Sequence, residues 1–225
     1  LRQLAQGRRP SVGELLLTPA NARRVADQLA QLRGAAMKVG QLLSMDAGDL
    51  LPPELSEILA RLRADAQPMP MSQLVTVLEA NWGKDWTRHF SRFSFTPMAA
   101  ASIGQVHAAE ALDGRRLAIK VQYPGIARSI SSDVDNVATL LRLSASLDIA
   151  PLLDEAKRQL HDEADYLKEA AHLRHYRSLL AGHPDFTLPE VVEGLGTTNV
   201  LVMSRVEGQS LDTLEAAPQA ERDRV

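Results

Sequence analysis

A lone lysine, Lys120, lies within a short segment, 117–122, whose side chains alternate in character. Three aliphatic residues of this segment fall on one face of an extended chain and Lys120 falls on the other, because successive side chains in a strand point to opposite faces. Asp113-Gly114 predicts a tight turn before it, and residues 105–110 form an extended partner. The sequence therefore predicts a β-hairpin that displays one ammonium group.

A run of very small side chains precedes this hairpin. Residues of this size let a ligand approach the backbone N–H groups, and those groups favour anions. We interpret the run and Lys120 as two sides of a phosphate site. The alternative is an exposed lysine on an ordinary hairpin, because short patterns of this kind recur by chance. The run comprises Ala99, Ala100, Ala101 and Ser102.

A second candidate pair, Lys38 and Gln41, lies on a helix predicted near the start of the chain. Thr18-Pro19 can begin this helix, and apolar residues then recur at alternating spacings of four and three. Lys38 lies about 140° from the centre of the apolar stripe. Gln41 lies three residues further on and is its neighbour. The pair belongs either to a functional site or to a solvated surface.

The elements that must position these residues define an α+β fold with five strands. Residues 1–83 are predicted to be a helical extension, which leads into a first strand around Phe93 and Phe95 and then into the hairpin. The remaining predicted elements are helices over 131–146 and 151–180, strands over 186–192 and 199–203, and a connector over 204–208.

Composition narrows the class of protein. The 225-residue chain has no cysteine, which excludes disulfides and cysteine-ligated metals, and its net charge of −3 argues against nucleic-acid binding. Residues 1–41 carry seven Lys and Arg against two Asp and Glu, which suits contact with an anionic membrane, a segment that covers a phosphate site, or a solvated face. No apolar run reaches the ~18–20 residues of a membrane span, and we expect no signal peptide from residues 1–20, which lack its pattern. We expect a cytoplasmic protein with at most a peripheral contact at the inner membrane, and the start at Leu1 and end at Val225 indicate a fragment.

Five motifs follow one another in order along nearly all of the chain. They are Lys38-Val-Gly-Gln41 with Leu50-Leu-Pro-Pro-Glu-Leu55, the alanine-rich run from Ala99 to His107, the segment from Lys120 to Gly125, the segment from Glu163 to Ala170, and Val200 to Met203 with Val206-Glu-Gly208. Residues 118–120 match the lysine strand of protein kinases. Together the five motifs resemble those of the UbiB family of atypical kinases, also called aarF-domain kinases.

The resemblance implies the small lobe of a protein kinase, with a five-stranded antiparallel sheet and one principal helix, the C helix. Residues 1–83 would be a helical extension that carries the K-x-G-Q motif. Residues 84–208 would form the lobe itself. Residues 209–225 would begin a linker to a large lobe that the chain lacks.

The resemblance also implies roles for the matched residues. Lys120 would bind the nucleotide phosphates and pair with Glu169 on the C helix. Lys38 and Gln41 would lie over the active site near Glu163 and Asp165, and the alanine-rich run would cover the phosphates. Backbone groups at the end of the last predicted strand and the start of the connector would hold adenine; the residues are Met203, Ser204, Arg205 and Val206.

Helix geometry limits how the acidic residues can divide these contacts. On a straight helix Asp165 and Glu169 share a face, whereas Glu163 lies about 200° from Asp165. Either the helix begins or bends at this point, or only one of Glu163 and Asp165 contacts Lys38. We prefer the arrangement in which Glu163 faces Lys38 and Glu169 faces Lys120.

The activity implied by the resemblance is ATP hydrolysis or small-molecule phosphorylation that supports ubiquinone synthesis. Expected ligands are ATP or ADP with Mg²⁺; lipids, quinone-pathway intermediates and quinone-synthesis proteins are further expected partners. The chain has no H-R-D-like loop and no D-F-G segment, so we expect the Mg²⁺ ligands on the missing large lobe and no activity from this fragment alone.

The alternative is a non-catalytic nucleotide-binding or scaffolding pseudokinase module. A di-iron site at Glu169 and His172 would need a second such pair, which the sequence lacks.

Overall fold

The structure, a computed structural model, describes Lys38 and residues 68–144, 150–209, 213–214 and 217–223. The helices predicted before residue 68, and Gln41 with them, lie outside the described residues. No helix in the described part of the chain is both long and apolar enough to span a bilayer. The elements are α5 (Met71–Trp82), the 3-10 helix η3 (Trp86–His89), β1 (Phe90–Ala100), β2 (Gly104–Ala111), β3 (Arg116–Gln122), α6 (Ile126–Ser144), α7 (Ala150–Glu163), α8 (Tyr166–Leu179), β4 (Val200–Ser204) and α9 (Gln219–Arg222).

The described strands form one antiparallel sheet in the order β1-β2-β3-β4. The predicted hairpin is confirmed as β2 and β3, and Gly114 in its turn has a φ of 84°, a conformation that glycine adopts without strain. Lys120 lies opposite Val106 on β2 and Leu201 on β4. Directly opposite residues share a face of the sheet, so Lys120 projects from the same face as these two aliphatic side chains.

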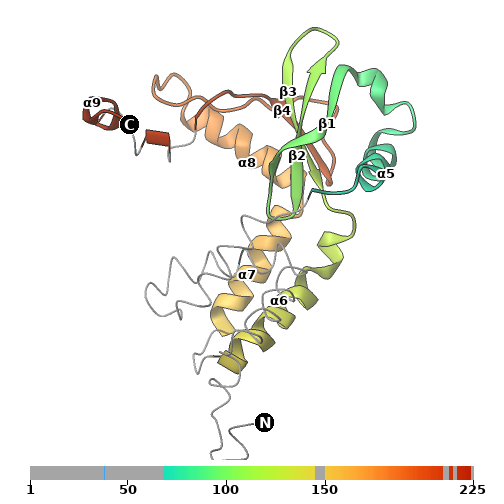
Figure 1. Cartoon of the computed structure of the whole chain (residues 1–225), viewed down its shortest axis with the longest axis vertical. Coiled ribbons are helices and arrows are strands. Elements are labelled where there is room, and N and C mark those ends of the chain that lie inside the picture. The colour runs from blue at the N-terminus through green and yellow to red at the C-terminus, as the bar shows by residue number, and fades with distance from the viewer. Residues whose placement is uncertain (1–37, 39–67, 145–149, 210–212, 215–216, 224–225) are drawn as a thin grey trace, which may run out of the picture.

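The two faces of the sheet pack against different helices (Figure 1). One face buries Leu117, Ile119 and Val121 against α5 and Trp86, so the last helix of the predicted extension and the sheet share one core. The other face packs against the region where α6, α7 and α8 meet, with Leu201 in that core. Lys120 therefore belongs to the face that α6, α7 and α8 partly cover.

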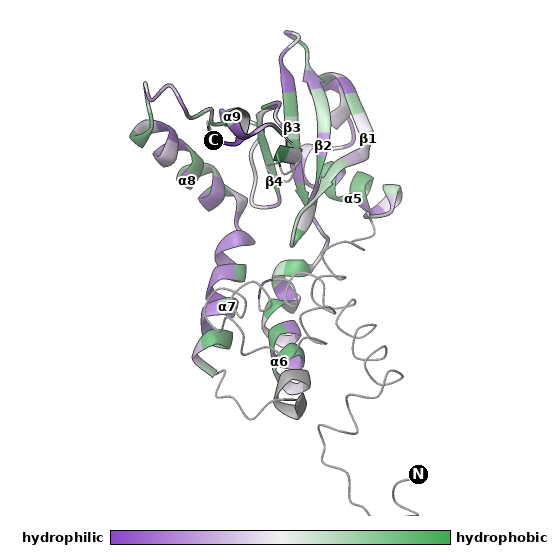
Figure 2. Cartoon of the chain, turned by 60° about the vertical axis from the view of Figure 1, so that its left-hand side comes forward, coloured by the Kyte–Doolittle hydropathy of each residue, from purple (hydrophilic) through white to green (hydrophobic). Residues whose placement is uncertain are grey.

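Helices α6 and α7 lie side by side and project from one end of the sheet (Figure 1). Hydrophobic and hydrophilic residues alternate along both helices (Figure 2), as expected for a pair that packs along one side. The residues of this pair that are buried in the shared core include Ile130, Val134, Val137 and Ala138 on α6 and Leu153, Ala156 and Leu160 on α7.

The described part of the chain has four strands where the sequence predicts five, because residues 186–192 do not form a strand. Val191 makes an isolated bridge to Met203, and Val192 N–H donates to the Val202 carbonyl at 2.9 Å. Pro189 has no N–H to continue the ladder. Arg177 also donates to the Leu188 carbonyl at 2.7 Å, which removes an acceptor from this segment. The α+β class is confirmed, but the fifth strand is replaced by an extended segment with one bridge.

The prediction of a single helix over 151–180 is also wrong, because the structure has two helices there, α7 and α8. Asp165 has an extended conformation, with φ −112° and ψ 95°, and its side chain accepts a hydrogen bond from Leu167 N–H at the start of α8. The Ala164 carbonyl accepts a hydrogen bond from the Gln122 side chain of β3. Both contacts favour a helix boundary, since an aspartate N-cap begins a new helix.

Candidate functional site

Lys120 and Glu169 form an ion pair between the sheet and the start of α8. Lys120 Nζ lies 2.7 Å and 2.8 Å from the two carboxylate oxygens of Glu169. The side chains are 18% and 34% exposed, so the pair is partly shielded from water. Glu169 takes two of the three N–H donors of the ammonium group, which leaves one for another acceptor. The pair holds the lysine at a fixed place on the sheet.

Tyr166 lies against the same ammonium group and was not singled out from the sequence. Lys120 Nζ lies 4.8 Å from the centre of the Tyr166 ring, and the tyrosine is fully buried. Burial, together with the charges of Glu169 and Glu163, raises the pKa of its hydroxyl well above the usual value of 10.0. The tyrosine therefore stays neutral at physiological pH and presents an electron-rich ring to Lys120. Its spacing of three from Glu169 is the sequence signal that places both near one helix face.

Glu163, the last residue of α7, joins two further predicted site residues. One carboxylate oxygen lies 2.5 Å from Lys38 Nζ, and the other accepts a hydrogen bond from Ser102 Oγ at 3.1 Å. The Lys38 side chain is 15% exposed and that of Glu163 is 34% exposed. The Glu163 carboxylate thus binds both Lys38, which lies 125 positions earlier in the chain, and Ser102, which lies 61 positions earlier. Gln41 lies outside the described residues.

The alanine-rich run forms the end of β1 and the tip of the β1–β2 hairpin. Ala99 and Ala100 are exposed, and Ala101 N–H donates to the Gly104 carbonyl at 2.9 Å. A Cβ added at Gly104 would lie 2.3 Å from the Val121 carbonyl oxygen and 2.9 Å from the Tyr166 hydroxyl. The close approach of this hairpin to β3 and α8 therefore requires glycine at position 104.

Hydrogen bonds between the sheet and the α7–α8 boundary position the acidic residues. Gln122 donates to the Ala164 carbonyl at 2.9 Å and is almost fully buried. Tyr166 N–H donates to the Thr198 carbonyl at 3.1 Å. Asp165 caps α8, and no hydrogen bond or ion pair joins it to either lysine among the described residues. The break between α7 and α8 thus lets Glu163 pair with Lys38 and Glu169 pair with Lys120.

The end of β4 and the connector after it already use part of their backbone hydrogen-bonding capacity. Ser204 N–H donates to the Glu190 carbonyl at 2.7 Å, and Arg205 N–H donates to the Arg116 carbonyl at 2.9 Å. Ser204 Oγ accepts a hydrogen bond from Glu190 N–H at 2.8 Å. The Val206 N–H makes no hydrogen bond to any residue that the structure describes, and Val206 is 42% exposed.

Two polar residues of the alanine-rich motif face the opposite side of the sheet. Gln105 accepts a hydrogen bond from Met69 N–H at 2.8 Å, and its amide nitrogen lies 2.8 Å from His107 Nε2. His107 Nδ1 lies 2.8 Å from the Ser94 carbonyl, which fits a neutral ring that donates from Nδ1. Burial lowers the pKa of His107, although the Ser94 contact raises it. Gln105 and His107 therefore bind segments of the chain together and do not face Lys120.

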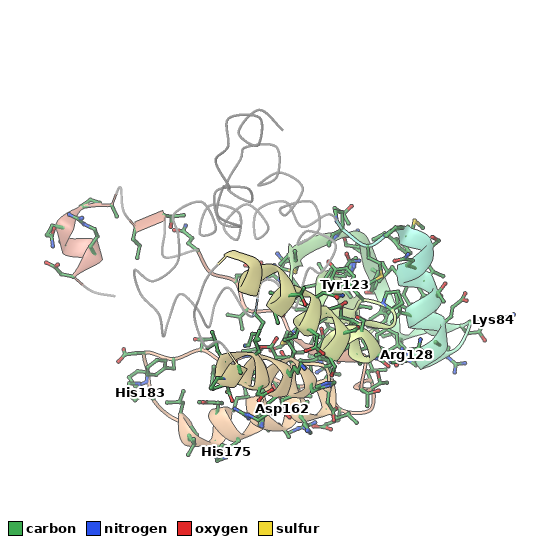
Figure 3. The ribbon with its side chains drawn as sticks, turned by 90° about the horizontal axis from the view of Figure 1, so that it is seen from below. Lys84, Tyr123, Arg128, Asp162, His175 and His183 are labelled. Carbon is green, nitrogen blue, oxygen red and sulfur yellow. The ribbon has the colours of Figure 1, made fainter. Side chains whose placement is uncertain are left out.

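Glu169 and His172, considered above for a di-iron site, are not part of a metal-binding cluster among the described residues. Among the described residues, no three His, Asp or Glu side chains are placed to hold a metal ion. His172 is exposed, and His175 points outward from α8 (Figure 3).

The site near Lys120 combines two lysines and two carboxylates around one helix boundary. Each lysine is paired with a different carboxylate, so the four charges balance. Small side chains at the hairpin tip and a remaining N–H donor on Lys120 suit an anion with several oxygens. A lysine–glutamate pair between a strand and a helix, beside a hairpin tip, is an arrangement found in kinase-like proteins.

Comparison with known proteins confirms the family predicted from the motifs. The family described as ABC1 atypical kinase-like domain matches residues 61–225, and the chain belongs to this family.

Curated relatives are similar along nearly the whole chain. The chain is 40% identical over 223 residues to "Atypical kinase COQ8, mitochondrial" of Saccharomyces cerevisiae, covering 97% of this chain and 44% of the relative. It is 41% identical over 213 residues to "Atypical kinase COQ8B, mitochondrial" of Rattus norvegicus, covering 93% of this chain and 40% of that protein. The chain thus spans less than half the length of these relatives.

A solved structure is also similar. It is the complex of Rv3197 with erythromycin from Mycobacterium tuberculosis, with 35% sequence identity and a TM-score of 0.56. The match covers 89% of this chain and 53% of the other.

Proposed function

We propose that this chain is the nucleotide-binding small lobe, with its helical extension, of an atypical kinase or ATPase. The ion pair between Lys120 and Glu169 is the observation that carries this proposal. In kinases the corresponding pair holds the lysine against the nucleotide phosphates. Membership of the ABC1 atypical kinase-like family supports the same conclusion.

The phosphates would lie between Lys120 and the alanine-rich tip. Ala99 and Ala100 are exposed and carry little side-chain bulk, and Ser102 is hydrogen-bonded to Glu163. Lys120 has one N–H donor beyond those bonded to Glu169, and it would donate to a phosphate oxygen. Glu169 would orient the ammonium group, and Lys38 and Gln41 of the extension would lie over the same site.

The adenine would be held by backbone groups from Met203 to Val206, at the end of β4 and directly after it. Ser204 and Arg205 already donate their N–H groups to the carbonyls of Glu190 and Arg116, so the Val206 N–H is the donor left for adenine. Val206→Pro removes this donor, and Val206→Ala keeps it. We expect weaker ATP binding for the proline variant and unchanged binding for the alanine variant.

Mg²⁺ would accompany the nucleotide, but the described residues do not offer it a cluster of ligands. We propose that its ligands and the catalytic base belong to parts of the protein beyond those described. The proposed reaction is ATP hydrolysis or phosphorylation of a small molecule in isoprenoid quinone synthesis. Asp165 would act by capping α8, which places Glu169.

Isothermal titration of the protein at its full natural length with Mg-ATP and Mg-ADP tests nucleotide binding. Lys120→Ala should weaken binding about tenfold or more, because a charge-assisted hydrogen bond contributes about 1.5–3 kcal/mol. The matched control is Lys157→Ala, which removes a lysine paired with Asp135 at 2.7 Å on the α6–α7 hairpin. Wild-type affinity in the Lys120 variant would contradict the phosphate role.

The quinone assignment needs a separate experiment. The gene should restore isoprenoid quinone production in cells that lack their own member of the family, and the Lys120→Ala gene should not. Nucleotide binding without turnover and without such rescue would favour the non-catalytic alternative.

A further inference from the structure

Tyr166 contacts three parts of the candidate site from the first position of α8. Its ring lies 4.8 Å from Lys120 Nζ. Its hydroxyl lies 2.9 Å from the position of a Cβ at Gly104, directly beneath the hairpin tip. Its backbone N–H donates to the Thr198 carbonyl beside β4. One buried aromatic residue thus lies between the lysine, the hairpin and the sheet.

The hydroxyl does not explain why this position holds a tyrosine. The oxygen is buried and has no hydrogen-bond partner in the described part of the protein. A buried hydroxyl without a partner lowers stability. The ring, in contrast, makes a favourable contact, since the negative face of an aromatic ring attracts an ammonium group.

The ring and Glu169 hold Lys120 in different ways. A carboxylate attracts the ammonium group and takes two of its N–H donors, so it competes with a phosphate for the same hydrogens. The neutral ring attracts the cation without cancelling its charge. A lysine held by both partners keeps its position when its N–H groups turn to a ligand.

We propose that Tyr166 is a positioning residue that holds the Lys120 ammonium group through its ring face and thereby sets the affinity of Lys120 for a nucleotide phosphate. The inference rests on the nucleotide-binding function proposed above. It assigns no role in this affinity to the tyrosine hydroxyl.

Graded fluorination of the ring is the deciding experiment. In the full-length protein, Tyr166 is replaced by phenylalanine carrying zero, one, two or three ring fluorines, which weaken the negative ring face with little change of shape. Tyr166→Phe should bind Mg-ATP within about twofold of wild type. Three fluorines should then weaken binding about 5- to 10-fold in graded steps. A flat response across the series would overturn the proposal, since a purely structural ring needs only its shape.

A double-mutant cycle tests whether Tyr166 affects Mg-ATP binding through Lys120. Tyr166→Leu should weaken Mg-ATP binding about 5- to 30-fold when Lys120 is present and less than about twofold in the Lys120→Ala background. Equal losses in both backgrounds would overturn the proposal. Tyr176→Leu, at an exposed position of the same helix, is the matched control and should leave binding unchanged.

Ligand-free unfolding separates a failure of this inference from a failure of the proposed function. If the wild-type protein binds no nucleotide, the proposed function is wrong. The fluorinated series should then still lower the urea midpoint stepwise with Lys120 present and not with Lys120→Ala. Identical midpoints along the series would show that the ring does not hold the lysine. If Tyr166→Leu does not fold, the fluorinated series still tests whether the ring holds Lys120.

Discussion

Replacing Glu163 with glutamine tests whether one carboxylate joins the N-terminal extension to the alanine-rich hairpin. Glutamine keeps the size and one acceptor oxygen but removes the negative charge. Lys38, whose side chain is only 15% exposed, would then keep its charge without the carboxylate that lies 2.5 Å away. We therefore expect a marked loss of stability, because a shielded charge without a partner is unfavourable.

The exposure of the Lys38 and Glu163 side chains sets the size of the expected loss of stability. Breaking a fully buried pair costs about 3–5 kcal/mol, whereas an exposed pair contributes about 0.2–1 kcal/mol. The Lys38 and Glu163 side chains, at 15% and 34% exposed, lie between these limits. Glu163→Gln should therefore lower the free energy of unfolding by about 1–3 kcal/mol. Ser102→Ala should cost less, about 1 kcal/mol, because it removes only one hydrogen bond.

Urea unfolding of a double-mutant cycle measures the contact itself. The cycle combines Lys38→Met with Glu163→Gln in the full-length protein, and we expect a coupling of about 1–2 kcal/mol. The control cycle combines Lys157→Met with Asp135→Asn, a pair whose side chains are 28% and 65% exposed. Its coupling should stay below about 1 kcal/mol.

Salt provides a second test of the same contact. Raising the ionic strength from 0.1 M to 1 M shortens the Debye length from about 10 Å to about 3 Å. The contact between Lys38 and Glu163 is shorter than this and partly shielded, so at least half of its coupling should remain. A coupling no larger than that of the control pair would refute the view that Glu163 joins the extension to the hairpin.

Three further variants test the supports of the site by urea unfolding. Gly104→Ala should cost about 1–3 kcal/mol, because its Cβ would lie 2.3 Å from the Val121 carbonyl oxygen and the hairpin must shift. Gln122→Ala should cost about 2–3 kcal/mol, because it leaves the buried Ala164 carbonyl without its partner. Burial holds the pKa of His107 below 6.5, so below pH 6.5 the unfolded chain binds a proton that the folded chain excludes. Stability should fall on acidification by up to about 1.4 kcal/mol per pH unit, and His107→Gln should remove this slope.

Matched variants make these results specific. Gly196→Ala should be nearly neutral, since a Cβ there meets nothing within 4 Å. His175→Gln, at an exposed histidine, should leave the pH dependence intact. A stable Gly104→Ala variant, an unchanged slope without His107, or a loss below about 0.5 kcal/mol for Gln122→Ala would each contradict the corresponding contact.

Local patterns predicted much of the fold. Alternation around Lys120 and the Asp113-Gly114 turn placed the β2–β3 hairpin, because strand periodicity and turn chemistry depend on neighbouring residues. The fifth strand could not be excluded in this way. Residues 186–192 are extended in character, but strand formation depends on which backbone groups remain available, and Pro189 and Arg177 remove some of them.

The candidate site was predicted less completely. The pairing of Lys120 with Glu169 followed from the family resemblance and is present in the structure. Helix spacing predicted that Glu163 and Asp165 could not both face Lys38 from a straight helix, and the structure pairs Lys38 with Glu163 alone of the two. The contacts of Tyr166 with Lys120 and of Gln122 with Ala164 were missed, because each joins residues that are more than 40 positions apart in the chain.

The sequence by itself determined the family, the order of the elements and the strand face that carries Lys120, because motifs and periodicity are properties of neighbouring residues. Only the tertiary structure decided where the helix after Ala150 breaks. The reason is that the Ala164 carbonyl bonds Gln122, which lies 42 positions earlier in the chain and reaches it only in the folded protein.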